Sequence, residues 1–131
     1  MNHSALTIGR LARAADVNIE TIRYYQRVGL VREPAKPRSG FRVHPAETVM
    51  RVRFIKRAQK LGFSLRDIGH LLELGDGHCE DVRIQAEAKL VQIESQIRDL
   101  RAMQSTLKKL VAECVSGDES GHCPIIHSLA G

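Results

Sequence analysis

Residues 6–30, LTIGRLARAADVNIETIRYYQRVGL, carry the pattern that decides the fold. Apolar residues at helical spacing follow Thr7, which can cap a first short helix, until Asp16-Val17-Asn18 breaks the pattern. Asn18 can cap a second helix, which Gly29 ends. Two short helices that are joined by a tight turn predict a helix-turn-helix.

The segment that follows, residues 31–43, is basic and reads as a wing. It contains two prolines, a Ser-Gly turn and the alternating apolar pair Phe41 and Val43. Such alternation around a turn is typical of two short paired strands. We therefore expect a small two-stranded wing beside the helix-turn-helix.

Two further helices are expected before the first clear linker. A third helix is predicted over 46–61, and Ser64 can cap a fourth helix over 65–74. The linker is Gly75-Asp76-Gly77, so we predict a winged helix-turn-helix DNA-binding domain over 1–76 and a second region over 77–131. The third helix is predicted to turn four apolar side chains inward: Val49, Val52, Phe54 and Ile55.

Length and charge limit the possible functions. The chain of 131 residues, with 43% hydrophobic and 27% charged residues, suits one folded domain with an appendage and excludes a large two-domain enzyme. Residues 1–76 hold 14 Lys and Arg against seven Asp and Glu, whereas the remaining residues hold six against eight. A basic half joined to a mildly acidic half indicates a polyanion-binding unit fused to something else. The start of the chain lacks the apolar stretch of a signal peptide, so we expect a cytoplasmic protein.

Residues 80–114 contain neither proline nor glycine, a run far longer than an average globular helix. Apolar residues recur there in alternating steps of three and four, which is the seam of a coiled coil. One such helix cannot bury its apolar stripe alone in so small a chain. We therefore expect a partner helix.

Three cysteines, Cys79, Cys114 and Cys123, all lie in the second region. An odd number in a cytoplasmic chain argues against a disulfide framework, which leaves buried hydrophobes, reactive thiols or metal ligands. Cys114 and Cys123 flank a loop of eight residues, which can bring two thiols to one ion. Cys79 precedes the long helix, and a rise of 1.5 Å per residue places it roughly 50 Å from Cys114 in the same chain.

An antiparallel dimer brings these cysteines together. If residue i of one chain faces residue 193 − i of the other, Cys79 meets the Cys114 of the partner chain. The same register pairs Val82 with Val111, Ala86 with Leu107, Leu90 with Met103 and Ile93 with Leu100, and only Ile97 against Gln96 is mixed. The predicted fold class is thus mainly α, with a winged helix-turn-helix domain, a long antiparallel coiled-coil dimerisation helix and a short C-terminal metal-binding segment.

Three thiolates favour a soft metal ion. The predicted site combines Cys79 of one chain with Cys114 and Cys123 of the other, twice per dimer. His78 and His122 each precede a cysteine and could add a fourth ligand, although solvated loop histidines are the plainer interpretation.

The second helix of a helix-turn-helix enters the major groove, so its polar residues are candidate DNA contacts. Arginine and hydroxyl side chains suit base edges or phosphate oxygens. At helical spacing, one of the two adjacent tyrosines is expected in the core. The candidate set is Thr21, Arg23, Tyr24 and Tyr25 on the helix, Arg38 and Arg42 on the wing, and Lys60 on the third helix.

Residues 6–9 (LTIG), 20–25 (ETIRYY), 29–30 (GL), 41–42 (FR) and 61–65 (LGFSL) together resemble the MerR family of bacterial transcription regulators. The resemblance covers nearly the whole chain. A cysteine before the long helix, another at its end, and Cys-Pro-Ile-Ile at 123–126 are similar to the mercury-responsive members of that family. Family members usually have tyrosine where this chain has His44, so the phosphate contact of that tyrosine is not carried over to this chain.

The resemblance implies a homodimer that binds double-stranded promoter DNA and acts on RNA polymerase. It implies that Cys79, Cys114 and Cys123 bind Hg(II) as inducer, and that the protein represses without metal and activates by distorting DNA. Relatives that sense Pb(II) or Cd(II) also use three cysteines, so those ions remain alternatives. A redox regulator with a Cys114–Cys123 disulfide is a further alternative. An enzyme is not expected, because the sequence offers no general base, cofactor loop or Cys-x-x-Cys pair.

Overall fold

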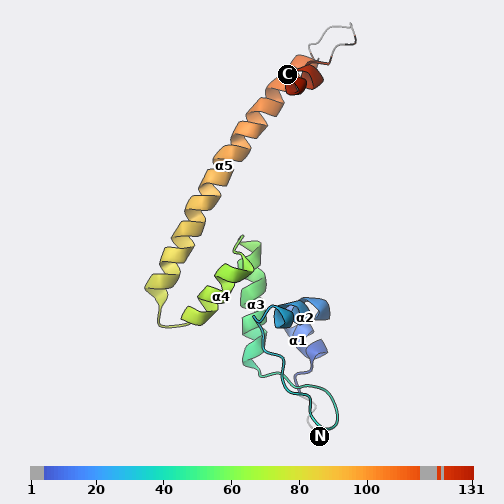
Figure 1. Cartoon of the computed structure of the whole chain (residues 1–131), viewed down its shortest axis with the longest axis vertical. Coiled ribbons are helices and arrows are strands. Elements are labelled where there is room, and N and C mark those ends of the chain that lie inside the picture. The colour runs from blue at the N-terminus through green and yellow to red at the C-terminus, as the bar shows by residue number, and fades with distance from the viewer. Residues whose placement is uncertain (1–4, 116–120, 122) are drawn as a thin grey trace. The chain divides into compact units, whose positions relative to one another are not determined.

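The computed structural model describes residues 5–115, 121 and 123–131, and the predicted mainly α fold is confirmed. The chain divides into two compact units, Met1–Val82 and Arg83–Gly131. No helix in the described part of the chain is both long and apolar enough to cross a membrane. The helices in order are α1 (Ile8–Ala15), α2 (Ile19–Arg27), α3 (Glu47–Lys60), α4 (Leu65–Leu74), α5 (Cys79–Val115) and α6 (Pro124–Ala130) (Figure 1).

Three helices of the first unit begin where capping residues predict. The side chains of Thr7, Asn18 and Ser64 accept hydrogen bonds from backbone N–H groups three residues later, at 3.4, 2.8 and 3.1 Å. Each cap satisfies a donor that the first helical turn leaves without a partner. Asp16 ends α1 in the left-handed region at φ 57°, which turns the chain sharply into α2. These caps confirm the predicted helix-turn-helix.

The core of the first unit is built by α1 to α4 and the turn after α2. Helix α1 packs on both α2 and α3, and α4 packs on α3 (Figure 1). All the core residues are at least nine-tenths buried, and they are Leu11, Ala12, Ala15, Ile22, Tyr25, Leu30, Val31, Val52, Ile55, Ala58 and Ile68.

Two arginines of α3 fasten this helix to its neighbours. Arg51 Nε donates to the carbonyl oxygen of Leu30 at 2.6 Å, and an Arg53 guanidinium nitrogen donates to that of Ala14 at 2.7 Å. Hydrogen bonds from a charged donor are stronger than neutral ones. These two cations therefore hold α3 against the last turn of α1 and the turn that follows α2.

The predicted inward position of Phe54 is wrong. The buried residues of α3 are Val52, Ile55 and Ala58, whereas Phe54 is 40% exposed. Successive helical residues are separated by about 100°, so Phe54 points well away from the face that Val52 and Ile55 share.

The two strands predicted for the wing are absent: residues 32–43, between α2 and α3, form no strand. This segment is called the wing loop below. Pro34 and Pro37 have no N–H to donate to a ladder, which opposes strand pairing. Side-chain bonds close the loop instead: Arg42 Nε donates to the carbonyl oxygen of Pro34 at 2.9 Å, and the Arg42 guanidinium lies 3.2 Å from the Glu33 carboxylate. Phe41 is 81% exposed, so the apolar alternation reflects no buried strand face.

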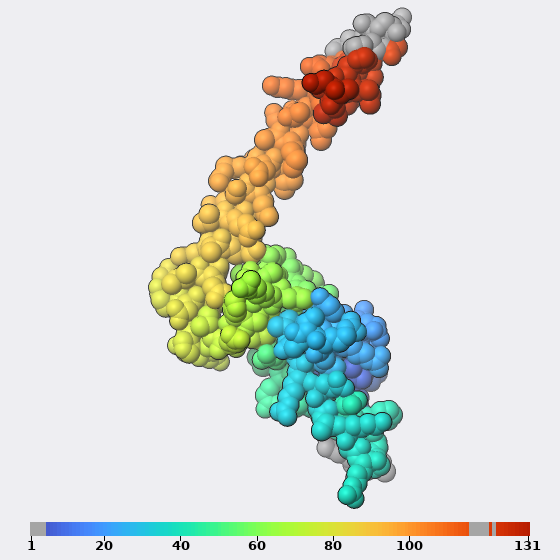
Figure 2. Space-filling view, viewed as in Figure 1, coloured from blue at the N-terminus to red at the C-terminus, as the bar shows by residue number. Residues whose placement is uncertain are grey.

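The second unit contains α6 and most of α5, and it buries very little. Among the described residues of α5, which runs for 37 residues, only Leu110 is buried. Figure 2 shows α5, in yellow to orange, as a rod one helix wide. Its apolar seam remains open to solvent at Leu90, Ile97, Leu100, Met103, Leu107 and Val111.

Candidate metal centre and nucleic-acid interface

The three cysteines lie at the two ends of α5 and at the start of α6. Cys79 is the first residue of α5 and Cys114 its penultimate residue, and both are exposed. Thirty-five residues of helix separate them by about 50 Å. Within the described residues no three Cys, His, Asp or Glu side chains gather closely enough to hold an ion. A single chain thus supplies only part of a three-cysteine site.

Cys114 and Cys123 are brought together. Cys123 is the N-cap residue of α6 and makes no side-chain cap hydrogen bond there, and its thiol lies near the backbone N–H groups of Ile126 and Ile125 and the Cys114 thiol. The backbone N–H group of Ile126 is the main cause that holds the pKa of the Cys123 thiol below its usual value, against a smaller opposing effect of burial. A lowered pKa favours the thiolate, which is the form that binds metals.

Of the two candidate histidine ligands, the structure describes only His78. The Nδ1 of His78 bonds to the carbonyl oxygen of Leu74 at 2.7 Å, so the ring is held against the end of α4 and only Nε2 remains for another partner. His122 lies outside the described residues.

The exposed face of α2 carries most of the candidate DNA contacts. Arg23 is exposed and lies 3.2 Å from Glu20. Tyr24 is 40% exposed, and the Arg27 guanidinium lies 5.6 Å from the centre of its ring. The Thr21 hydroxyl donates to Asn18 Oδ1 at 2.8 Å, which leaves its oxygen free to accept.

Tyr25 occupies the core rather than the surface. It is 1% exposed, and its hydroxyl donates to Gln59 Oε1 at 2.6 Å, which ties α2 to α3. Burial raises the pKa of this phenol. A side chain with so little exposed surface has no area to offer DNA, so the predicted contact by Tyr25 is corrected to a structural role. The expectation that one of the two adjacent tyrosines lies in the core is confirmed, and that tyrosine is Tyr25.

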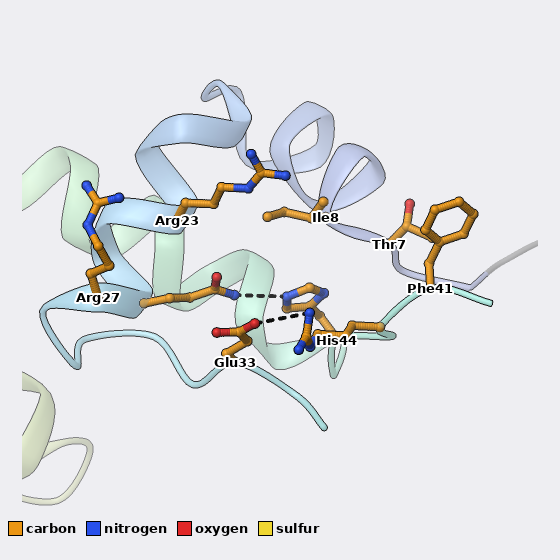
Figure 3. A pocket seen from close by; sticks show the side chains of 9 residues that line it. Thr7, Ile8, Arg23, Arg27, Glu33, Phe41 and His44 are labelled. Carbon is orange, nitrogen blue, oxygen red and sulfur yellow. Dashed lines mark hydrogen bonds and ion pairs between the residues drawn. The ribbon is translucent and has the colours of Figure 1, made fainter. Parts of the chain in front are cut away.

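A surface cavity of about 450 Å³ lies between α2 and the wing loop. Arg23, Arg27 and Arg42 line it, together with His44 and Glu33 (Figure 3). The site predicted from sequence omitted Arg27, although its position four residues after Arg23 places both on one helix face. Three guanidinium groups around one cavity suit a polyanion such as the DNA backbone.

The remaining two candidate cations lie elsewhere in the first unit. Arg38 is exposed in the wing loop, and Lys60 is the exposed last residue of α3. Neither lines the cavity between α2 and the wing loop.

Family models match most of the chain. Residues 6–74 match the model described as MerR HTH family regulatory protein, and residues 49–110 match the one described as MerR, DNA binding. The chain is 48% identical to a mercuric resistance operon regulatory protein of Shigella flexneri, over 99% of this chain and 91% of the relative.

Two solved structures with bound metal resemble the fold. One is the regulator PbrR691 of Ralstonia metallidurans CH34 in complex with lead(II), at 32% identity and a TM-score of 0.80, covering 95% of this chain and 98% of that one. The other is MerR of Bacillus megaterium MB1 in complex with mercury(II), at 35% identity and a TM-score of 0.73, covering 96% and 99%. With the helix-turn-helix observed and both family models matched, the chain belongs to the MerR family of helix-turn-helix transcription regulators.

Proposed function

We propose that this chain is a mercury(II)-responsive transcription regulator of a mercury resistance operon, acting in the cytoplasm. The observation that carries the proposal is the full-length similarity, at 48% identity, to regulators named for mercuric resistance. The three thiols give that similarity a chemical basis, because mercury(II) is a soft ion and thiolates are soft ligands.

The working form is a homodimer with antiparallel α5 helices. The exposed seam of α5 supports this, since a coiled coil covers such a stripe. In the register where residue i faces residue 193 − i, apolar residues meet in four layers. The DNA-binding domain comprises residues 1–76, and residues 77–131 provide dimerisation and metal binding.

The metal site combines Cys79 of one chain with Cys114 and Cys123 of the other. Contact between Cys114 and Cys123 within one chain, and the lowered pKa of the Cys123 thiol, suit this donor set to a soft cation. A bound Hg(II) would supply strong bonds that join the two chains. Because Cys79 lies five residues after the end of α4, such a bond would act close to the DNA-binding domain.

Double-stranded promoter DNA is the partner of the first unit. Arg23 and Tyr24 on α2 are its candidate base or phosphate contacts, and Thr21 offers its hydroxyl oxygen. Arg38 and Arg42 on the wing loop and Lys60 on α3 would bind phosphate. The cavity geometry adds Arg27 to this set.

The regulator represses without metal and activates RNA polymerase when metal is bound, through distortion of the promoter. Metal can shift the equilibrium between two dimer states only if it binds one of them more tightly. Bending or untwisting DNA costs several kcal/mol. Bonds between metal and thiolates at both ends of the paired α5 helices would supply the free energy that distorting the DNA costs.

A second candidate keeps the mechanism and changes the ion. The similarity to a lead(II)-bound regulator favours Pb(II) as the alternative inducer, and Cd(II) shares its preference for thiolates. A thiol redox regulator with a Cys114–Cys123 disulfide is a weaker candidate, because it leaves Cys79 without a role.

A metal titration of the reduced dimer tests the proposal. We would follow thiolate-to-metal absorption for Hg(II), Pb(II), Cd(II) and Zn(II), with wild type, Cys79→Ala and Ser105→Ala as the matched control on α5. Mercury should bind tightest, and Cys79→Ala should weaken it by more than about 100-fold, beyond the usual cost of losing an outer-shell partner. Tighter binding of another ion would reject mercury as inducer, and wild-type affinity in Cys79→Ala would reject the shared site.

A further inference from the structure

His44 ends the wing loop and is 4% exposed. Apart from Tyr25, it is the one buried residue with a polar side-chain group in the part of the chain that the structure describes. It lines the cavity that Arg23, Arg27 and Arg42 also line, where Figure 3 shows its ring opposite the side chains of α2. Burying a polar ring is unfavourable unless its nitrogens find partners.

Each nitrogen of His44 has a partner. Its backbone N–H donates to the carbonyl oxygen of Leu6 at 2.8 Å, and its ring Nδ1 lies 3.3 Å from the same oxygen. Nε2 lies 3.1 Å from the side-chain nitrogen of Gln26. A carbonyl oxygen can only accept, so Nδ1 carries the hydrogen and Nε2 accepts from the Gln26 amide.

These bonds join three segments that are far apart in the sequence. Leu6 precedes α1, Gln26 is a half-buried residue of α2, and His44 closes the wing loop. Gln26 stands three residues after Arg23 and directly before Arg27, while Arg42 stands two residues before His44. The ring therefore connects the segment that carries Arg42 to the helix that carries Arg23 and Arg27.

We propose that His44 is a positioning residue for DNA binding, which holds Arg42 of the wing loop at a fixed distance from Arg23 and Arg27 of α2. The proposal rests on the proposed function, because it assumes that these arginines bind DNA. The phosphates of a duplex are regularly spaced, so cations that are held in matching positions bind without losing further freedom. The wing loop has no strand pairing to fix it, and it depends on the bonds of Arg42 and His44 instead.

The chemistry of the ring suggests a graded set of variants. Asn at position 44 keeps an amide nitrogen where Nδ1 lies, so His44→Asn retains the bond to Leu6 and loses the one to Gln26. His44→Leu removes both ring bonds. Gln26→Met removes the bond to Nε2 from the other side. His70→Leu makes the same substitution at a histidine of α4 outside the cavity and is the matched control.

The test measures DNA dissociation constants of the full-length reduced protein over a range of KCl concentrations. The probe is a labelled duplex that the wild-type protein has selected from random-sequence DNA. The slope of log affinity against log salt falls by about 0.9 for each phosphate that the protein no longer neutralises. A purely structural loss of active protein would change the apparent affinity and leave this slope unchanged.

We expect His44→Leu to weaken binding about tenfold and to reduce the salt slope by about 0.9, the change that corresponds to one phosphate. Arg42→Gln should then matter less in the His44→Leu background than in wild type. His44→Asn and Gln26→Met should give similar intermediate effects, and His70→Leu none. If His44→Leu does not fold, His44→Asn and Gln26→Met carry the same comparison.

An unchanged slope in the position-44 variants, with Arg42→Gln equally harmful in both backgrounds, would overturn the role of His44 while DNA binding itself stands. If the wild-type protein selects no duplex at all, both the proposed function and this positioning role fail.

Discussion

The two compact units of the chain differ in how many of their apolar side chains they bury. In Met1–Val82, four short helices and one turn bury eleven core residues against one another. In Arg83–Gly131, the long α5 leaves most of its apolar seam exposed, and Leu110 is its one buried residue among those described. The first unit contains its own core, whereas the second presents a face that another helix must cover.

This difference assigns separate tasks to the two units. A unit with its own core can hold Arg23, Arg27 and Arg42 in fixed positions around the cavity between α2 and the wing loop. An exposed seam is suited to a second copy of the chain, and the thiols lie at the ends of that seam. We infer that metal acts where the chains meet and that DNA is bound where each chain is complete by itself.

The largest expected effect is on the free energy of unfolding, and it distinguishes the core of the first unit from the exposed seam of α5. Ile55→Ala removes a fully buried side chain from α3, so it should lower the free energy of unfolding by about 2–5 kcal/mol whatever the protein concentration. Ile97→Ala makes the same change on α5, where the side chain is 41% exposed in one chain. Its effect should be smaller and should shrink as the protein is diluted, because the interface contributes nothing once the copies of wild type and variant have both separated. Denaturant unfolding at two protein concentrations distinguishes the variants. If the losses of unfolding free energy in Ile55→Ala and Ile97→Ala depended equally on protein concentration, the contrast between the two units would be wrong.

A charge in the α5 seam should separate the two copies. Leu90→Asp places a carboxylate against Met103 of the partner chain in the proposed register, so the dimer dissociation constant should rise about 100-fold. Gln92→Asp, on the opposite side of α5, should leave it unchanged. Sedimentation equilibrium measures both. A dimer that tolerates Leu90→Asp would show that another surface holds the copies together.

A smaller effect is expected at the turn of the first unit. Asn18→Ala removes the cap that accepts from the Thr21 N–H, which should cost about 1 kcal/mol of unfolding free energy. Asn18→Ser keeps an acceptor and should cost much less. Thermal unfolding at one protein concentration compares them. Equal losses for alanine and serine would mean that the cap contributes nothing beyond the shape of the turn.

The smallest effect concerns Cys123 in metal-free protein. Its pKa is lowered, so its thiolate persists at pH values where an ordinary thiol is protonated, and the alkylation rate should reach half-maximum at a lower pH. Cys114→Ala should move that midpoint upward only in part, because the N–H groups of Ile125 and Ile126 remain. Mass spectrometry of the alkylated peptide follows the rate. A midpoint at the ordinary thiol value would reject the stabilisation of the Cys123 thiolate by the N–H groups of Ile125 and Ile126.

Local signals in the sequence predicted most of the helices. Thr7, Asn18 and Ser64 marked three helix starts, and α4 runs over the predicted residues 65–74. Such caps depend on neighbours within one turn, which a sequence displays directly. The wing strands could not be predicted so well, because strand pairing depends on two separated segments, and here the bonds of Arg42 replaced it.

The candidate site was predictable only in its residue types. The spacing of Tyr24 and Tyr25 predicted that one of them is buried, but only the folded unit, in which the Tyr25 hydroxyl reaches Gln59 of α3, shows that it is Tyr25. The cavity that joins Arg27 and His44 to Arg23 depends on how the wing loop returns to α2. The approach of Cys114 to Cys123 followed from the short loop between them, whereas Cys79 begins α5 and can meet them only in the proposed dimer.

The most direct test of the shared metal site is a mixed dimer. One chain carries Cys79→Ala, and the other carries Cys114→Ala together with Cys123→Ala. If each site takes Cys79 from one chain and Cys114 and Cys123 from the other, the mixed dimer contains one complete site, and each parent homodimer contains none. Titration with Hg(II) should then restore three-thiolate absorption at one ion per mixed dimer. A mixed dimer whose spectrum is the average of the two parents would contradict the shared site.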